Sequence, residues 1–146
     1  RRCRLEQAKT LYARWGSLVS HFCELFLGER SKAEAATVET FVRFLQGGGR
    51  AAAEGTPVQL LSCAFQVADH AGAETARTAE PLRAAIVRLS TTQRAVFILH
   101  GTLSVQMPWV AAIIGVTPHE AAQLWCKALL EIRNYLPRDF FKERSR

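Results

Sequence analysis

Residues 107–120 read MPWVAAIIGVTPHE and decide the fold of the whole sequence. Apolar side chains supply the inner face of a short helix, and Gly115 follows where the chain must turn and a side chain would clash. Thr117, Pro118 and Glu120 are suited to be the capping residue, first-turn proline and capping-box partner of a second helix. This spacing is typical of a helix-turn-helix, the motif whose second helix enters the major groove of DNA, although an ordinary helical hairpin can imitate it.

The helix after this turn has one apolar face, and two shorter helices are predicted before it. Intervals of three and four residues place its apolar side chains on one side. They are Ala121, Leu124, Trp125, Ala128, Leu129, Ile132 and Leu136. Upstream, Pro81 starts a short helix that runs to Leu89, and Ser90 caps another that reaches Leu99.

The first half of the chain predicts further helices. Residues 5–27 have apolar side chains at helical spacing and stop at Gly28, which suits a left-handed C′ position. Ser31 and Glu34 form a capping box for a second helix, which runs to about Gln46. The apolar residues that this second helix is expected to bury are Ala35, Val38, Phe41, Val42 and Leu45.

A third helix and a linker complete the predicted organisation. Thr56-Pro57 is expected to cap the third helix, which fades after His70. Residues 72–80 (GAETARTAE) are small and polar and predict a linker. No stretch has a β-type alternation. The sequence therefore predicts an all-α fold of two small helical domains, residues 1–71 and 81–146, joined by the short linker 72–80.

Composition and cysteine usage favour a cytoplasmic protein. With 49% hydrophobic and 22% charged residues, the chain suits compact domains rather than disorder. No apolar run approaches the roughly 18 residues that a membrane span needs, so no membrane partner is expected, and residues 1–20 lack the features of a signal peptide. Two disulfides are formally possible, but the widely spaced Cys3, Cys23, Cys63 and Cys126 favour reduced thiols.

Residue chemistry argues against an enzyme, and the charge distribution favours nucleic acid. Gly47-Gly48-Gly49 lacks the Lys-Ser/Thr that follows in a phosphate-binding loop, and the histidines are isolated in the sequence. No catalytic residue, cofactor or metal ion is therefore expected. The net charge of +6 indicates an anionic partner. Its basic excess lies in residues 1–46 and 77–146, so nucleic acid is favoured for the two ends only.

Two segments together resemble the extracytoplasmic-function (ECF) group of bacterial sigma factors, which contain sigma regions 2 and 4 and little else. In the first half, residues 27–29 (LGE), 33–34 (AE) and 39–43 (ETFVR) are similar to the family's L-G-D … A-E-D-x-x-Q-E-x-F-x-R segment. In the second half, residues 89–97 (LSTTQRAVF) resemble the L-P-x-x-Q-R-x-V-F opening of region 4. The helix-turn-helix follows at the right distance, so both matches occur in the family's order.

The resemblance implies a role in transcription regulation, with core RNA polymerase and double-stranded promoter DNA as partners and an anti-sigma factor as a further one. The second helix would dock on the clamp coiled coil of the polymerase through Glu34, Glu39 and Arg43. The last long helix would read the −35 element, and Gln123 suits adenine. The residues expected to bind DNA are Thr117, His119, Glu120, Gln123 and Lys127. Each set of residues also has an alternative. The charges of the second helix would then only face solvent, and the last long helix would only pack against the rest of its domain.

The sequence departs from the family pattern where the partners would bind. Ala35 and Val38 replace a carboxylate and a glutamine of the polymerase-binding helix, which is expected to weaken docking by about 1–3 kcal/mol. Residues 60–70 match the family's promoter-melting stretch and contain no Lys or Arg. The recognition helix keeps Lys127, with Arg133 further along, where the family has several basic residues.

Two functions therefore remain open at this point. The chain is either a divergent ECF-type sigma factor or a degenerate sigma-like protein that acts by protein–protein contacts without binding a promoter. The second function would use exposed apolar residues, for which the candidates are Val38, Leu130 and Leu61.

Overall fold

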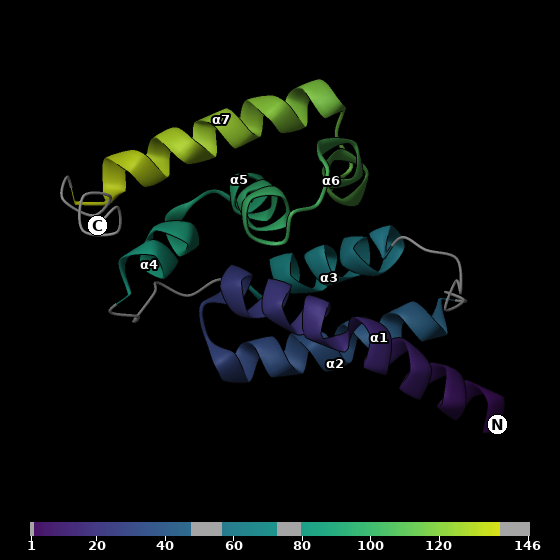
Figure 1. Cartoon of the computed structure of the whole chain (residues 1–146). Helices are drawn as coiled ribbons and strands as arrows, with labels where there is room; N and C mark the ends of the chain where they lie inside the picture. Colours follow the sequence, from purple (N-terminus) through teal and green to yellow (C-terminus); the bar gives the residue numbers. More distant parts are fainter. Residues whose placement is uncertain (1, 48–56, 73–79, 138–146) are drawn as a thin grey trace.

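The computed structural model describes residues 2–47, 57–72 and 80–137, and these ranges are helical with no strand (Figure 1). The predicted all-α class is confirmed. The elements are α1 (Arg2–Leu27), α2 (Arg30–Gln46), α3 (Val58–Ala71), α4 (Pro81–Arg88), α5 (Thr91–Val96), the π-helical turn η1 (Phe97–Thr102), α6 (Met107–Ile114) and α7 (Pro118–Tyr135). Thr56 and most of the predicted linker lie outside the described residues, and the domain boundaries stay a prediction.

Helix α1 ends where the sequence predicts and buries the predicted face. Val19, Phe22 and Phe26 are fully or almost fully buried against α2 and α3. The helix stops because Gly28 adopts a φ of 73°, a left-handed conformation that costs glycine little. The Gly28 amide donates to the Glu24 carbonyl at 2.9 Å and closes the last turn. The chain then reverses, so α2 runs back alongside α1 (Figure 1).

The buried face of α2 differs from the predicted one. Ala35 is exposed, and 61% of Val38 and 46% of Val42 are exposed, so the prediction that these three are buried is wrong. The helix instead buries Ala33, Ala36, Thr37, Thr40 and Phe41. Threonine is tolerated there because each hydroxyl donates to a carbonyl one turn earlier, at 2.7 Å in both cases. Hydrophobic periodicity cannot reveal this face, since it counts threonine as polar.

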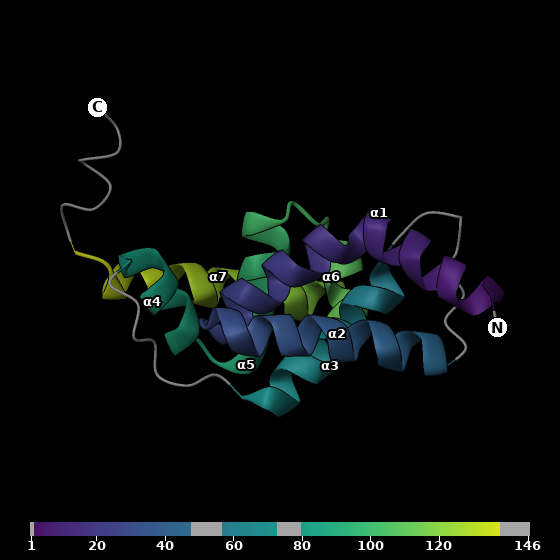
Figure 2. The same cartoon turned by 90° about the horizontal axis from the view of Figure 1, so that it is seen from below.

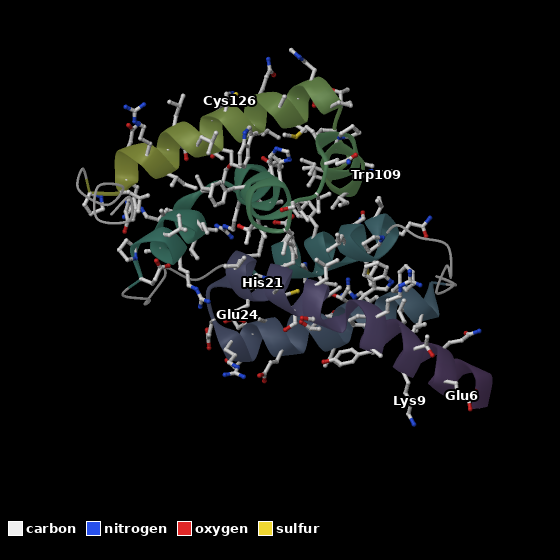
Figure 3. The ribbon with its side chains drawn as sticks, viewed as in Figure 1. Glu6, Lys9, His21, Glu24, Trp109 and Cys126 are labelled. Atoms are coloured by element: carbon white, nitrogen blue, oxygen red, sulfur yellow. The ribbon has the colours of Figure 1, made fainter. Side chains whose placement is uncertain are left out.

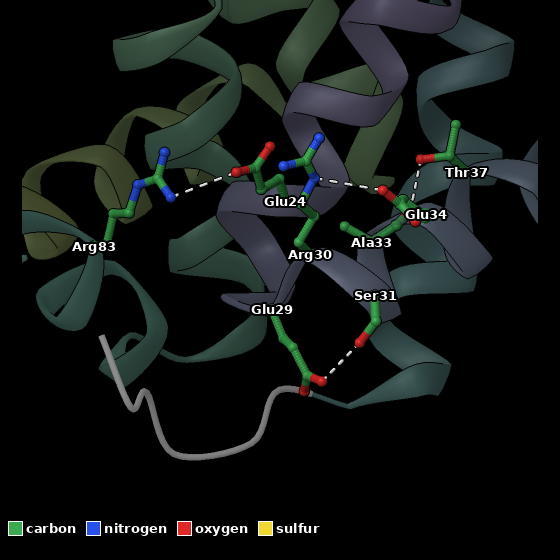
Figure 4. Close-up of polar contacts among 8 residues, drawn as sticks. All are labelled: Glu24, Glu29, Arg30, Ser31, Ala33, Glu34, Thr37 and Arg83. Carbon is green, nitrogen blue, oxygen red and sulfur yellow. Dashed lines mark hydrogen bonds and ion pairs between the residues drawn. The ribbon is translucent and has the colours of Figure 1, made fainter. Parts of the chain in front are cut away.

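The predicted capping box of α2 is also wrong. The helix begins at Arg30 with Glu29 in the N-cap position, and no side chain caps it. Ser31, the predicted cap, lies inside the first turn, and its hydroxyl donates to the Glu29 carboxylate at 2.8 Å (Figure 4). Glu34 lies one turn further on, where it pairs with Arg30 at 3.4 Å instead of closing a box (Figure 4).

The second group of helices starts at the predicted residues. Helix α4 begins at Pro81, and the Glu80 carboxylate caps it by accepting from the backbone amides of Leu82 and Arg83. Helix α5 begins after Ser90, as predicted, although the Ser90 side chain makes no capping bond. Helix α7 then lies across α5 and α6 (Figure 1).

The two groups of helices pack against each other over one continuous apolar core. Helix α3 lies between the α1–α2 pair and α6, and α1 also contacts α4 (Figures 1 and 2). The buried cluster contains side chains from both groups, including Leu61 of α3 and Val110 of α6. Leu61 is only 1% exposed, so its predicted place among exposed apolar residues is wrong.

Thiol chemistry in this core is suppressed by burial. Burial raises the pKa of the Cys23 thiol to about 11, although a hydrogen bond with Thr37 opposes the shift. Burial also raises the pKa of Cys63, whose thiol donates to the Thr40 carbonyl at 3.6 Å. Cys23, Cys63 and the exposed Cys126 are all free thiols. The side chain of Cys3 lies outside the described residues.

A buried arginine holds the ends of α1 and α4 together. Arg94 is only 7% exposed, and its guanidinium donates to backbone carbonyls of both groups. The acceptors are Val87 at 2.6 Å, Leu89 at 2.9 Å, Phe26 at 3.2 Å and Ile86 at 3.3 Å. The guanidinium also lies 4.8 Å from the centre of the Phe26 ring. These carbonyls lie at helix C-termini, where the helix dipole favours a cation.

Replacing Arg94 is expected to destabilise the protein strongly. Burial lowers the pKa of Arg94 and the nearby Asp69 raises it, but arginine stays charged in proteins. Arg94→Met would leave buried carbonyls without donors, and we expect a loss of about 3–5 kcal/mol of unfolding free energy, measured by urea denaturation. The control is Arg83→Met, which removes a half-exposed ion pair with Glu24 and should cost less than about 1 kcal/mol. Equal losses would contradict this role of Arg94.

Candidate functional site

The turn between α6 and α7 has helix-turn-helix geometry. Helix α6 ends at Ile114, and Gly115 follows with φ 79° and ψ 35°, the left-handed conformation. The amides of Gly115 and Val116 both donate to the Ala111 carbonyl, at 2.9 and 3.0 Å. Glycine is needed for its backbone angles, because a Cβ at Gly115 would meet no atom within 4 Å. The predicted steric reason is therefore wrong, while the predicted turn is confirmed.

The start of α7 is capped as the sequence predicts. The Thr117 hydroxyl accepts from the Glu120 amide at 3.1 Å, and Pro118 occupies the first turn. Residues 117–120 are all exposed, so this helix end faces solvent. A solvent-facing helix N-terminus favours an anion such as a DNA phosphate.

The predicted DNA-binding residues lie together on the exposed side of α7. His119 and Gln123 are adjacent, with Nε2 of one 3.2 Å from Nε2 of the other. Glu120 and Lys127 lie at helical spacing along a second row beside His119 and Gln123, and both are exposed. Helix α7 lies on the far side of the molecule from α1 and α2, so this row is open to a partner (Figures 1 and 3).

The outward row of α7 becomes apolar toward its C-terminal end. Residues 119, 123, 126 and 130 are spaced by four, three and four, which places them on one face. Cys126 and Leu130 therefore continue the row begun by His119 and Gln123. Leu130 is 57% exposed, which agrees with the sequence prediction. Leu129, predicted to lie on the packing face, is 42% exposed.

The charges of α7 nearly cancel. Lys127 and Arg133 are matched by Glu120 and Glu131 on the same helix. A helix of this kind gives little general attraction for phosphates, which normally dominates affinity for DNA. Any DNA binding by α7 must therefore depend on its polar row and on its N-terminal amides.

The predicted polymerase-binding residues are divided between two sides of an apolar row on α2. Ala35, Val38 and Val42 form this row along the centre of the exposed face. Glu39 and Arg43 lie on one side of it and pair at 2.6 Å. Glu34 lies on the other side, where it pairs with Arg30 (Figure 4). Both ion pairs have i,i+4 spacing, which could have been recognised in the sequence.

The described residues contain neither a metal-binding cluster nor a membrane-spanning helix. No group of three or more His, Cys, Asp or Glu within residues 2–47, 57–72 and 80–137 could hold a metal ion. In the same part of the chain, none of the helices combines the length and the apolar character needed to cross a membrane. A surface hollow of about 320 Å³ lies between α4 and α7, where the Arg88 guanidinium is 4.6 Å from the centre of the Tyr135 ring.

A comparison with known proteins identifies the fold to which this arrangement of helices belongs. The chain has the fold of an ECF sigma factor. One similar solved structure is that of CnrH in complex with the cytosolic domain of CnrY, with a TM-score of 0.73. The match covers 87% of this chain and 85% of CnrH at 17% sequence identity, so it shows the fold alone. No family model and no curated protein matches the sequence.

Removing the cap of α7 is expected to loosen the start of this helix. Thr117→Ala deletes the acceptor for the Glu120 amide and should lower the unfolding free energy by about 1 kcal/mol. Thr117→Ser keeps the hydroxyl and should retain most of the stability. Thermal unfolding of the two variants and the parent provides the measurement. Equal destabilisation by both substitutions would show that methyl packing, not capping, accounts for Thr117.

Proposed function

We propose that this chain is a divergent ECF-type sigma factor, which binds core RNA polymerase through α2 and promoter −35 DNA through α7. The observation that carries the proposal is the capped helix-turn-helix, whose α7 faces solvent within a sigma-factor fold. The protein would act in the cytoplasm as a transcription regulator without enzymatic activity. An anti-sigma factor is a further proposed partner, and the complex of CnrH with the cytosolic domain of CnrY supports it.

The polymerase contact would have an apolar centre and a charged rim. Val38 and Val42 would be the parts of α2 that gain most from burial, since both are largely exposed. Glu39 and Arg43 would remain at the edge, where a charged residue mainly sets orientation and association rate. An apolar centre with charges at its rim is the usual composition of a protein interface.

A polymerase-binding experiment tests the first half of the proposal. Glu39→Ala removes a rim charge and releases Arg43, and we expect core polymerase to bind about tenfold more weakly in a competition pull-down. The matched control is Gln46→Ala, which changes an exposed residue near the end of the same helix and should leave binding unchanged. If the parent chain itself fails to bind core polymerase, the sigma-factor proposal is wrong.

The DNA contact would rely on few ionic interactions. Lys127 is the basic residue in the middle of α7, and it lies one turn after Gln123, whose side chain contacts His119. Such a surface supplies limited counterion release, so affinity for an isolated −35 duplex should be low. Polymerase contacts would supply the remaining affinity by holding α7 next to the promoter.

A salt titration of promoter binding by the polymerase–protein complex tests the second half. Replacing Lys127 by Gln should reduce the slope of log affinity against log salt concentration by about 1. Lys9→Gln removes the same charge from α1, on the opposite side of the molecule from α7 (Figure 3), and should leave the slope unchanged. Identical slopes for the two variants would place the DNA elsewhere than on Lys127.

A second function is favoured by one specific observation. The outward row of α7 ends in Cys126 and Leu130, and the exposed centre of α2 is apolar as well. Exposed leucine and valine rows suit a protein partner better than a phosphate backbone. A degenerate sigma-like protein that acts through such contacts would bind a protein partner but show no salt-dependent binding of duplex DNA.

A further inference from the structure

The side chains of His119 and Gln123 form one hydrogen-bonded pair on the exposed side of α7. Residue 123 follows residue 119 by four positions, so the two side chains are neighbours along one face of the helix. Nε2 of the Gln123 amide lies 3.2 Å from Nε2 of the His119 ring. The Thr117 cap fixes the start of α7, which places the pair in the first two turns of the helix. In a helix-turn-helix these turns contact the edges of the bases.

The atoms in this contact determine which way the Gln123 amide faces. An amide NH₂ group only donates, so a nitrogen–nitrogen contact of this length is a hydrogen bond only when Nε2 of the imidazole accepts. In this arrangement the ring proton of His119 is on Nδ1. The contact uses one of the two amide hydrogens. The other hydrogen and the Oε1 oxygen of Gln123 are left side by side for a partner.

A donor beside an acceptor matches the major-groove edge of adenine and mismatches that of guanine. Adenine presents its N7 acceptor next to the N6 amino donor, and the amide of glutamine binds both. Guanine presents two acceptors, N7 and O6, so it requires two donors. If the Gln123 amide turned over, Oε1 would face residue 119 and the NH₂ group would supply those two donors. Whether residue 119 accepts or donates a hydrogen bond therefore decides which purine the amide matches.

We propose that His119 is the positioning residue that makes Gln123 select adenine in the −35 element. The acceptor on His119 holds the NH₂ group of Gln123 on its own side. The amide then offers Oε1 to the N6 amino group of adenine and its second hydrogen to N7. This inference rests on the proposed binding of α7 to promoter DNA. Phosphate contacts such as the one proposed for Lys127 carry no sequence information, so selection at this position falls to the pair.

A library of duplexes with a randomised −35 element, bound by the polymerase–protein complex and sequenced, provides the test. The parent should enrich adenine over guanine about tenfold at one position, because a bidentate base contact discriminates at about this level. Gln123→Ala should remove the preference at that position alone. His119→Ala frees the amide to turn over and should reduce the same preference to about twofold.

Two exchanges at position 119 separate amide orientation from packing. His119→Glu places a group that only accepts beside the Gln123 amide and should keep adenine enriched. His119→Lys places a group that only donates there, which attracts Oε1 and should shift the enrichment toward guanine. Enrichment compares bases within one variant, so the effect of the changed charge on overall affinity cancels. With Gln123→Ala added, neither exchange should produce a preference at this position.

Three results would overturn this role of His119. In the first, Gln123→Ala removes a preference for a base other than adenine. In the second, the adenine preference is unchanged in both His119→Ala and His119→Lys. In the third, the exchanges at position 119 alter base preference even with Gln123→Ala, which would mean that this position contacts the base directly. A parent complex that enriches no −35 sequence at all would instead contradict the proposed function, and this inference with it.

Discussion

The fold depends on a buried cation, the guanidinium of Arg94, whose hydrogen bonds go to carbonyls where two helices end. Arg94 donates to carbonyls at the C-termini of α1 and α4, which would otherwise lack donors inside the protein. A buried guanidinium without these acceptors would be costly, and buried carbonyls without the guanidinium would be costly as well. The arginine therefore fixes where α4 begins its packing against α1. Together with the packing of α3 against α6, that contact sets the position of the helix-turn-helix relative to the first three helices.

The sequence predicted several helix ends that local chemistry determines, although it misplaced the cap of α2. Gly28 and Gly115 end their helices through positive φ, while Pro81 and Thr117 mark helix starts. These signals act within one turn of the chain, so they can be read without tertiary information. The face of α2 could not be predicted in this way. The hydroxyls of its buried threonines donate to carbonyls one turn earlier, so these residues can be buried. Which face of α2 is buried then depends on how α1 and α3 pack against it.

The sequence predicted where the candidate binding residues lie better than it predicted which apolar residues are exposed around them. The resemblance to the family already named His119, Gln123 and Lys127, and all three are exposed on α7. The exposed apolar row of α2 was predicted only in part: Val38 was named as an exposed apolar candidate as well as a core residue, while Val42 was counted toward the core alone. Whether an apolar residue is buried depends on what the rest of the chain covers, and periodicity alone gives no direction for the core.

The two candidate surfaces lie on different sides of the molecule, with α2 on one side and α7 on the other (Figure 1). Each surface by itself offers little for strong binding, because α2 has only a short apolar row and the charges of α7 nearly balance. Under the proposed function, one binding event raises the effective concentration of the other surface at its target. That gain depends on geometry. If the arrangement of helices is rigid, both surfaces can bind at once only when the distance between the two targets matches the distance between α2 and α7. The packing of α3 against α6 and the contacts of α1 with α4 and η1 set this separation of α2 and α7.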